Sequence, residues 1–205
     1  MGIAERKQRE KEIRLAEIKK SAASVFQKKG YATATVDEIA RLCEISKTQI
    51  YQYFKSKDDL LYSILEPEIA RLTERIGILV KNGKEPASET IRKIFTVSYE
   101  HYDQNPDVYQ MLWQHNIHAL PDHKLNRLEH MLRENTHHME TAIKKGIDQG
   151  LFREVDPKLA AIVVWSLYMG VYHHQAKRML GRKTDYRKST IDAALELILQ
   201  GLKRK

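Results

Sequence analysis

The chain has 205 residues, of which 42% are hydrophobic and 30% are charged, and its formal net charge is +8. This balance is too apolar for an intrinsically disordered chain, and the excess of Lys and Arg favours a polyanionic partner such as nucleic acid. The longest uncharged apolar run, residues 159–172, is shorter than the roughly 20 residues that span a bilayer. We therefore expect no membrane-spanning helix.

Most of the positive charge lies near the N-terminus. Residues 1–57 contain thirteen Lys or Arg against seven Asp or Glu, which accounts for six of the eight net charges. The single cysteine, Cys43, excludes an intramolecular disulfide, and the first residues lack the apolar stretch of a secretory signal. We expect a cytoplasmic protein whose anion-binding surface lies in the first quarter of the chain.

Apolar residues recur at helical spacing along the chain, which predicts an all-α fold of about nine helices. The first helix covers residues 5–29, and the high charge of its first two turns favours fraying there. Three cap signals then follow in close succession, at Thr35, Ser46 and Ser56. They predict two short helices, 35–42 and 46–53, joined by the turn 43–45, and a longer helix that starts near residue 57.

The longer helix is predicted to reach residue 80 with Pro67 inside it. Because proline removes a backbone hydrogen bond and clashes with the preceding turn, this helix should be kinked or split near Glu66. The clearest loop of the chain, residues 82–86, follows it. The remaining helices are predicted over residues 87–104, 106–118, 122–150, 157–181 and 185–202.

Two short helices joined by a three-residue turn are typical of a helix-turn-helix, whose second helix enters the major groove of DNA. The spacing within residues 46–53 points Ile50 inward, together with Phe54. The outward face then carries Lys47, Thr48, Gln49, Tyr51 and Gln52, with Tyr53 towards one side. Glutamine can pair with adenine and lysine with guanine, whereas tyrosine and threonine can reach phosphate or a thymine methyl group. Lys55 and Lys57 follow directly, where contacts to the DNA backbone would be useful.

The same stretch resembles the DNA-binding signature of the tetracycline-repressor (TetR) family. The resemblance rests on Gly30-Tyr31, on residues 35–40 (Thr-Val-Asp-Glu-Ile-Ala) and on residues 46–60, and it covers about residues 18–65. Downstream, the chain resembles the family only in helical pattern and length. The resemblance implies a DNA-binding domain at 1–57 and a ligand-binding and dimerisation domain at 58–205. It also implies a homodimeric repressor that leaves a palindromic operator in double-stranded DNA when a small molecule binds.

By position, the resemblance assigns roles within this surface. Contacts to the phosphate backbone are expected from Thr35, Tyr51, Tyr53 and Lys57. Positions nearest the bases are expected for Lys47, Thr48, Gln49 and Gln52. The complete predicted set is Thr35, Ser46, Lys47, Thr48, Gln49, Tyr51, Gln52, Tyr53, Lys55 and Lys57. Two positions depart from the family pattern: Glu44 stands where glycine is frequent, and Thr48 replaces a small residue, usually glycine.

Aromatic and polar residues of the C-terminal helices are candidates for a ligand cavity. The set is Tyr99, Tyr102, Trp113, Asn135, His138, Trp165 and Tyr168. The alternative is that they are ordinary core or interface residues, because Trp and Tyr fill space and a buried Tyr needs only one hydrogen-bond partner. The stacking surface favours an apolar or aromatic effector, and an acyl chain would suit the same walls.

Metal binding and catalysis have weaker signals. His130, Glu134 and His138 have helical spacing that could gather ligands on one face, but the HExxH motif and a nearby cysteine are missing, so we expect no metal. Walker, dinucleotide-binding and nucleophile-elbow motifs are also missing, so we expect neither a cofactor nor an enzyme. The competing functions are an architectural DNA-binding protein, and a helical enzyme or binding module whose basic end meets another acidic partner.

The apolar run 159–172 and the stripe from Ile191 to Leu202 predict a dimer interface built by the last two long helices. Switching is expected to act through the helix that contains Pro67. A ligand beside Ile69, Leu72 or Ile76 would move that helix, with Pro67 as the pivot.

Overall fold

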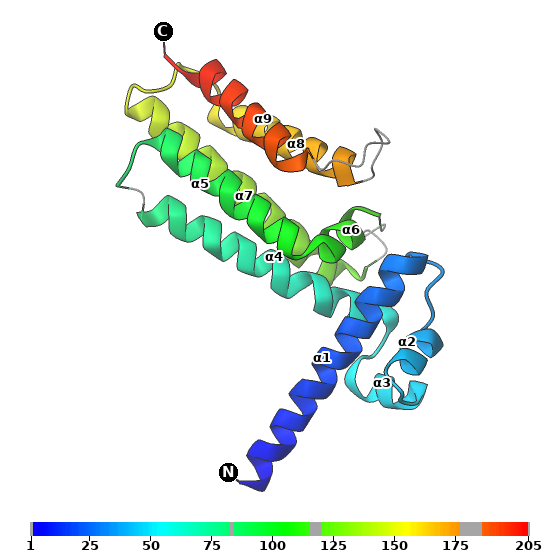
Figure 1. The fold of residues 1–205 in the computed structure, drawn as a ribbon. Helices are drawn as coiled ribbons and strands as arrows, with labels where there is room; N and C mark the ends of the chain where they lie inside the picture. The colour runs from blue at the N-terminus through cyan, green and yellow to red at the C-terminus, as the bar shows by residue number, and fades with distance from the viewer. Residues whose placement is uncertain (1, 83, 115–119, 177–185, 205) are drawn as a thin grey trace. The chain divides into compact units, whose positions relative to one another are not determined.

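The computed structural model describes residues 2–82, 84–114, 120–176 and 186–204, and these residues are almost entirely helical (Figure 1). The all-α prediction is confirmed, and the described residues contain one isolated antiparallel bridge, between Phe152 and Lys203. The helices are α1 (Ile3–Lys29), α2 (Val36–Leu42), α3 (Lys47–Tyr53), α4 (Lys57–Asn82), α5 (Ala87–Gln104), α6 (Pro106–Gln114), α7 (Asp122–Asp148), α8 (Pro157–Ala176) and α9 (Arg187–Leu202).

The chain divides into two compact units. Unit 1 contains Met1–Glu68 and Asn105–Arg127, and unit 2 contains Ile69–Gln104 and Leu128–Lys205. Two of the three boundaries fall inside α4 and α7, so each of these helices contributes residues to both units, and the third lies between α5 and α6. The predicted border at residue 57 separates a DNA-binding domain from a ligand-binding domain. It divides the chain by function and not by compactness, so it stays a prediction.

In unit 1, the two short helices begin where their cap residues predict. The Thr35 hydroxyl accepts a hydrogen bond from the Glu38 backbone N–H (3.3 Å), and the Glu38 carboxylate accepts one from the Thr35 N–H (3.1 Å). Ser46 and Gln49 form the same reciprocal pair at 3.2 and 2.9 Å. Helices this short are marginal alone, so packing must hold them. Their buried side chains include Val36, Ile39, Ala40 and Ile50.

The remaining helices of unit 1 pack around α1. Helices α2 and α6 both contact α1, whose buried side chains are Ile18, Ala22, Val25 and Phe26. The first turns of α7 attach to α4 through two ion pairs, Lys124 with Asp59 and Arg127 with Glu66. Helix α2 thus packs on α1 and α3 packs on α2, which fixes the orientation of the candidate recognition helix.

The structure differs from the expected fraying of α1 and from one of the two alternatives expected at Pro67. The first turns of α1 are helical from Ile3, because side-chain pairs four residues apart, such as Arg6 with Glu10 (2.9 Å), support them. Of the two alternatives at Pro67, the split does not occur, since α4 is one helix with Pro67 inside it, and the kink stays a prediction. Proline removes only one backbone donor, and fully buried neighbours, Leu65 and Ile69, hold the helix on both sides.

Unit 2 has an aromatic core. The ring of Tyr168 on α8 meets Phe95, Tyr102 and Trp165 edge-to-face at centroid distances of 5.2, 5.7 and 5.6 Å. At one end of α7, a Cβ atom added to Gly146 would overlap the ring of Phe152, so these two residues pack more closely than any larger residue at 146 would allow. Helix α9 packs on both α8 and α5.

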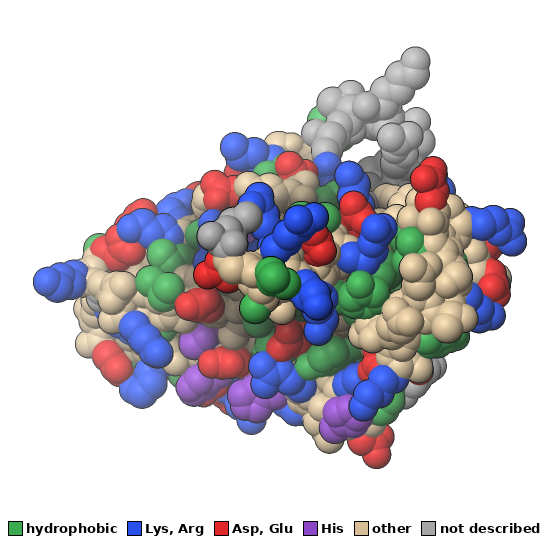
Figure 2. All heavy atoms as spheres, turned by 90° about the horizontal axis from the view of Figure 1, so that it is seen from below, with side chains coloured by type: hydrophobic (Ala, Val, Ile, Leu, Met, Phe, Trp, Pro, Cys, Tyr) green, Lys and Arg blue, Asp and Glu red, His purple; other side chains and the backbone are tan. Residues whose placement is uncertain are grey.

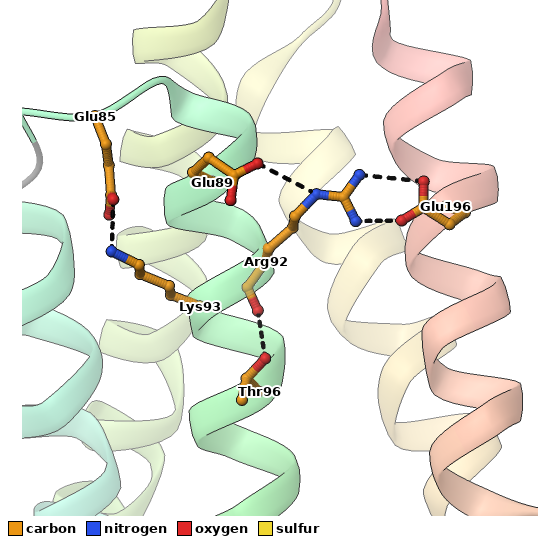
Figure 3. A network of polar contacts seen from close by, with 6 residues as sticks. All are labelled: Glu85, Glu89, Arg92, Lys93, Thr96 and Glu196. Carbon is orange, nitrogen blue, oxygen red and sulfur yellow. Dashed lines mark hydrogen bonds and ion pairs between the residues drawn. The ribbon is translucent and has the colours of Figure 1, made fainter.

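Polar contacts join α5 to α9 on the surface of unit 2. Figure 3 shows the Arg92 guanidinium forming a bidentate pair with Glu196 of α9, with Glu89 on its other side at 3.5 Å. Lys93 pairs with Glu85 at 2.5 Å at the start of the same helix. The hydrogen bonds from Arg92 lower the pKa of the Glu196 carboxyl, and the same contact raises the pKa of Arg92. Of these pairs, Arg92–Glu196 is the one that connects α9 to α5 of the same chain.

Candidate DNA-binding surface

The turn between α2 and α3 sets the direction of α3. Glu44 has a φ of 56°, in the left-handed region, and its N–H donates to the Arg41 carbonyl (3.2 Å). The following N–H, of Ile45, donates to the Ala40 carbonyl (3.0 Å) and closes the end of α2. Glycine adopts this φ without strain, which explains why it is frequent at this turn position in similar sequences.

Helix α3 has one buried side and one exposed side. Ile50 and Phe54 are buried, as their spacing predicts. The exposed side chains are Lys47, Thr48, Gln49, Tyr51 and Gln52, and Tyr53 is half-buried. The structure thus brings most of the predicted DNA-binding residues to one solvent-facing side of one helix.

Two of these side chains are already engaged in the free protein. The Gln49 carbonyl oxygen accepts from both the backbone N–H (2.9 Å) and the hydroxyl (3.1 Å) of Ser46. The Lys47 ammonium pairs with Asp37 on α2 (2.7 Å), which raises the pKa of Lys47. Gln49 would have to leave its cap to pair with a base through both amide atoms, whereas the exposed pair of Lys47 is inexpensive to break. The Asp37 contact was not predicted from the sequence.

Lys57 lies in a different environment from the rest of the set. Its ammonium donates to the backbone carbonyls of Tyr31 (2.8 Å) and Ala34 (3.1 Å) and lies 4.3 Å from the centre of the Tyr31 ring. The Tyr31 hydroxyl in turn donates to the Asp58 carboxylate, and burial and this carboxylate both raise the pKa of Tyr31. Lys57 therefore ties the α1–α2 loop to the start of α4.

The neighbouring cap is strengthened by a long-range ion pair. Glu38 pairs with Lys29 at the end of α1 as well as with the Thr35 N–H. The hydrogen bond from Lys29, followed by that from Thr35, lowers the pKa of Glu38 from 4.5 to about 2. Thr35 is exposed beside this pair, and Lys55 is exposed after α3. On the face shown in Figure 2, Lys and Arg side chains are interspersed with Asp and Glu side chains. For DNA binding, the cations without an acidic partner therefore matter more than the total number of Lys and Arg.

The ligand candidates of the C-terminal helices separate into groups. Tyr102, Trp165 and Tyr168 belong to the aromatic core, and the Trp165 indole N–H donates to the Asn135 backbone carbonyl (3.0 Å). His138 packs against Gly77 of α4, where burial lowers its pKa. Tyr99 is half-buried on α5. The Trp113 side chain lies outside the described residues.

Sequence inspection missed two buried polar side chains near this core, Thr90 and Ser98. Their hydroxyl oxygens, like the side-chain oxygen of the predicted candidate Asn135, are buried and have no hydrogen-bond partner among the described residues. Ser98 lies three residues after Phe95 and four before Tyr102, so it shares their face of α5. The only sequence signal for Ser98 was a serine within the apolar stripe of α5. Buried polar atoms without partners are uncommon and call for an explanation.

Metal and membrane sites find no support in the described part of the chain. No group of three His, Cys, Asp or Glu side chains among the described residues is arranged to hold a metal ion. Among the helices of that part, none combines the length and apolar character needed to cross a bilayer.

The two short helices, their three-residue turn and the exposed polar side of α3 define a helix-turn-helix protein. Comparisons with known proteins agree in both parts of the chain. Residues 18–64 match the model "Bacterial regulatory proteins, tetR family", and residues 88–196 match the model "Tetracyclin repressor-like, C-terminal domain". The chain belongs to the tetR family of bacterial regulatory proteins.

Three similar proteins illustrate the range of the likeness. The HTH-type transcriptional repressor NicS of Pseudomonas putida is 28% identical over 138 residues, which span 67% of this chain and 65% of that protein. The structure of PfmR from Thermus thermophilus covers 91% of this chain and 99% of that one at 23% identity, with a TM-score of 0.77. The structure of FadR from Bacillus subtilis in complex with stearoyl-CoA covers 91% and 98% at 21% identity, with a TM-score of 0.73. The two structures support the fold alone.

Proposed function

We propose that this chain is a ligand-released transcriptional repressor that binds a palindromic operator as a homodimer through α3. The observation that carries the proposal is the exposed polar side of α3, held by the buried Ile50 immediately after a three-residue turn. A helix presented in this way fits the major groove, where base pairs differ in their hydrogen-bonding groups. The family of the chain and the repressor name of NicS support the same class of function.

Within α3, we assign base reading first to Gln52 and Thr48. Both are exposed, and among the described residues neither side chain has a hydrogen bond that would have to break on binding. Gln52 can present both amide atoms to adenine, and Thr48 can place its methyl group against thymine. Tyr51, Tyr53, Lys55 and Thr35 are proposed to contact phosphates, which position the protein without reading sequence.

A second copy of the chain is the proposed partner of the exposed side of α8. Four large apolar side chains there share one face by their spacing and are 59%, 45%, 55% and 38% exposed: Leu159, Ile162, Val163 and Leu167. On α9, Leu197 is 75% exposed. An apolar face on two adjacent helices is what a twofold four-helix interface requires, because the same face then meets itself.

The effector is proposed to enter the aromatic core of unit 2. Tyr102, Trp165 and Tyr168 offer apolar and stacking surface, and the partnerless oxygens of Ser98 and Asn135 offer polar contacts. An apolar or aromatic molecule suits this lining, and an acyl chain is a specific option. The structure of FadR in complex with stearoyl-CoA supports that option as an example within the same fold.

Switching is proposed to act through α4. The boundary between the two compact units lies between Glu68 and Ile69, directly after Pro67. The buried side chains Ile69, Leu72 and Ile76 of the same helix belong to unit 2, where the effector would bind. A ligand can shift the equilibrium only by its differential affinity, and roughly 100-fold release of the operator requires about 2.7 kcal/mol of such preference.

Selection from random duplex DNA, followed by footprinting of the enriched sequence, tests the DNA-binding proposal. Protection of two half-sites related by a twofold axis is expected. A long footprint without a palindrome would indicate an architectural DNA-binding protein instead. Complete lack of sequence-specific protection would point to a different acidic partner and would overturn the proposal.

The effector site is tested with Ser98→Ala in a thermal-shift panel of fatty acids, acyl-CoA thioesters and aromatic compounds. Removal of a buried hydroxyl without a partner should leave the melting temperature of the free protein unchanged or raised, because its desolvation penalty disappears. The stabilisation by an active compound and the accompanying operator release should both decrease. Thr96→Ala, an exposed position on the same helix, is the control. Unchanged responses in Ser98→Ala would exclude Ser98 from the site.

A further inference from the structure

The first third of α1 extends beyond the rest of unit 1. The Cys43 sulfur, at the α2–α3 turn, lies 4.0 Å from the carbonyl oxygen of Glu17, so this turn is level with residue 17 of α1. The preceding residues of α1, from Ile3 to Ala16, continue past the turn (Figure 1). At 1.5 Å per residue they reach about 20 Å beyond it. We call residues 3–14 the α1 extension.

The α1 extension is solvated and almost wholly polar. Residues 2–13 are all exposed, and their side-chain hydrogen bonds, Glu5 to Gly2, Arg6 to Glu10 and Gln8 to Glu12, stay within this stretch. Its large apolar side chains, Ile3 and Ile13, are 81% and 51% exposed and stand alone. A surface without an apolar stripe is poorly suited to hold another protein or a second helix. The α1 extension is therefore a poor docking surface for a partner of that kind.

Its acidic side chains are occupied, while three of its cations are not. Glu5 accepts from the Gly2 N–H, Glu10 pairs with Arg6, and Glu12 accepts from Gln8, at 2.7–2.9 Å. Among the described residues, no hydrogen bond or ion pair engages the side chains of Lys7, Arg9 and Lys11. Of its carboxylates only Glu10 pairs with a cation, and with five Lys or Arg against three Glu the α1 extension keeps a net charge of +2.

Two of these free cations face the packed side of α1. Lys11, Ile18 and Val25 follow at intervals of seven residues, and Lys7 lies one turn before Lys11, so all four share one face. Ile18 and Val25 are buried in that face. Arg9 lies nine residues before Ile18 and thus on the opposite side. Lys7 and Lys11 therefore project on the side of α1 that carries the other helices of unit 1.

The extension also leaves unit 1 at the end where α3 begins. Lys47, the first residue of α3, follows the turn that lies level with Glu17. In a helix-turn-helix, the N-terminal residues of the recognition helix are those that contact base edges. The free lysines are thus carried past the end of the protein that approaches the duplex.

We propose that the α1 extension is a second DNA-contacting element, in which Lys7 and Lys11 bind phosphates of the duplex outside the bases that α3 reads. This inference rests on the proposed DNA-binding function. A reach of about 20 Å corresponds to about six base pairs at 3.4 Å per step. The contact carries no base preference, so it adds affinity and salt dependence without changing the consensus sequence.

The test compares the full-length parent with the Lys7→Gln/Lys11→Gln variant on the duplex that the parent itself selects, with long and with trimmed flanks. Each lost phosphate contact removes about 0.9 from the slope of log affinity against log salt. The parent's loss of affinity between 50 and 200 mM salt should therefore exceed that of the variant by about tenfold for each bound protomer. On the trimmed duplex, the two proteins should bind alike.

Arg9→Gln/Lys20→Gln is the matched control, because it removes the same charge from the opposite face of α1, where both side chains are exposed. It should retain most of the parent's salt slope on the long duplex. Equal slopes for the parent and the Lys7→Gln/Lys11→Gln variant would overturn the inference and leave the proposed repressor function standing. An equal loss of slope in the control would also overturn it. If the parent selects no duplex, the proposed function fails and the inference falls with it.

Discussion

At the scale of single residues, several side chains around α3 have hydrogen-bond partners in the DNA-free protein, and these partners determine which side chains are available to contact DNA. Gln49 and Ser46 cap α3, and Lys57 binds backbone carbonyls in the α1–α2 loop. Such contacts compete with DNA for the same polar atoms. A side chain that helical spacing places on the exposed face is therefore not always free to bind DNA, and Gln52 is more available for DNA than Gln49.

We predict that Gln52→Ala reduces discrimination at one base pair of each half-site by about 1–3 kcal/mol, the value of one lost bidentate pair. Gln49→Ala should instead lower the melting temperature of the free protein, since an N-terminal cap of α3 is weakened. Affinities for a panel of operators with single-base changes measure the first effect. If Gln49→Ala flattens the base preference while Gln52→Ala does not, then Gln49 leaves its cap on binding and the assignment must be reversed.

Glu44 allows a separate prediction about stability. Its left-handed φ of 56° strains an L-residue by roughly 1–2 kcal/mol, and glycine relieves that strain while gaining freedom in the unfolded chain. Glu44→Gly should therefore stabilise the protein by about 0.5–1 kcal/mol, which raises the melting temperature by roughly 1–4 °C for a chain of this length. Calorimetry or denaturant unfolding measures the change. Glu44→Ala keeps the strain and should bring no gain; an equal gain would show that the carboxylate, not the backbone, is responsible.

At the scale of elements, agreement between sequence and structure depends on how local the determining contacts are. The starts of α2 and α3 were predictable because each cap joins residues only three apart. The uninterrupted course of α4 through Pro67 was not, because burial of residues around it offsets a local defect. The role of Lys57 was missed for a related reason, since its partner Tyr31 lies 26 residues away.

The contact between the end of α1 and the cap of α2 predicts an acid-sensitive part of the stability. The folded pKa of Glu38 is about 2, below its ordinary 4.5. Its contribution is therefore fully present above about pH 4.5 and is lost as the pH falls towards 2. Glu38→Gln, which keeps the capping geometry without the charge, should be less stable than the parent at pH 7, and the gap should narrow as the pH falls. Unfolding midpoints between pH 7 and 3 provide the measurement; a constant gap would show that the charge contributes nothing.

At the scale of the whole molecule, substitutions on the exposed face of α8 can test dimer assembly separately from folding of the protomer. Ala161 and Leu195 belong to the predicted interface helices, but they are buried within their own unit. Charges at these two positions would test whether the protomer folds. Leu159, Ile162, Val163 and Leu167 are the side chains that a partner could cover, and an exposed apolar face of this kind is costly for a monomer.

Val163→Arg should therefore convert a dimer into a monomer without unfolding it, because the charge would be buried unpaired only in the assembly. Sedimentation at micromolar concentration gives the mass, and circular dichroism confirms retained helix. Ile78→Arg is the matched control, since Ile78 of α4 is 50% exposed against 55% for Val163. A parent that sediments as a monomer, or a Val163→Arg protein that remains a dimer, would place the interface elsewhere.

The close packing of Gly146 on Phe152 constrains how this sequence can change over evolutionary time. An alanine at 146 is incompatible with the ring as it now lies, so the two positions are not free to vary one at a time. A lineage that first replaces Phe152 by a smaller side chain could later accept a residue other than glycine at 146, whereas the reverse order passes through a damaged protein. The order of mutations, and not only their identity, is thus restricted at the junction between α7 and the segment leading to α8.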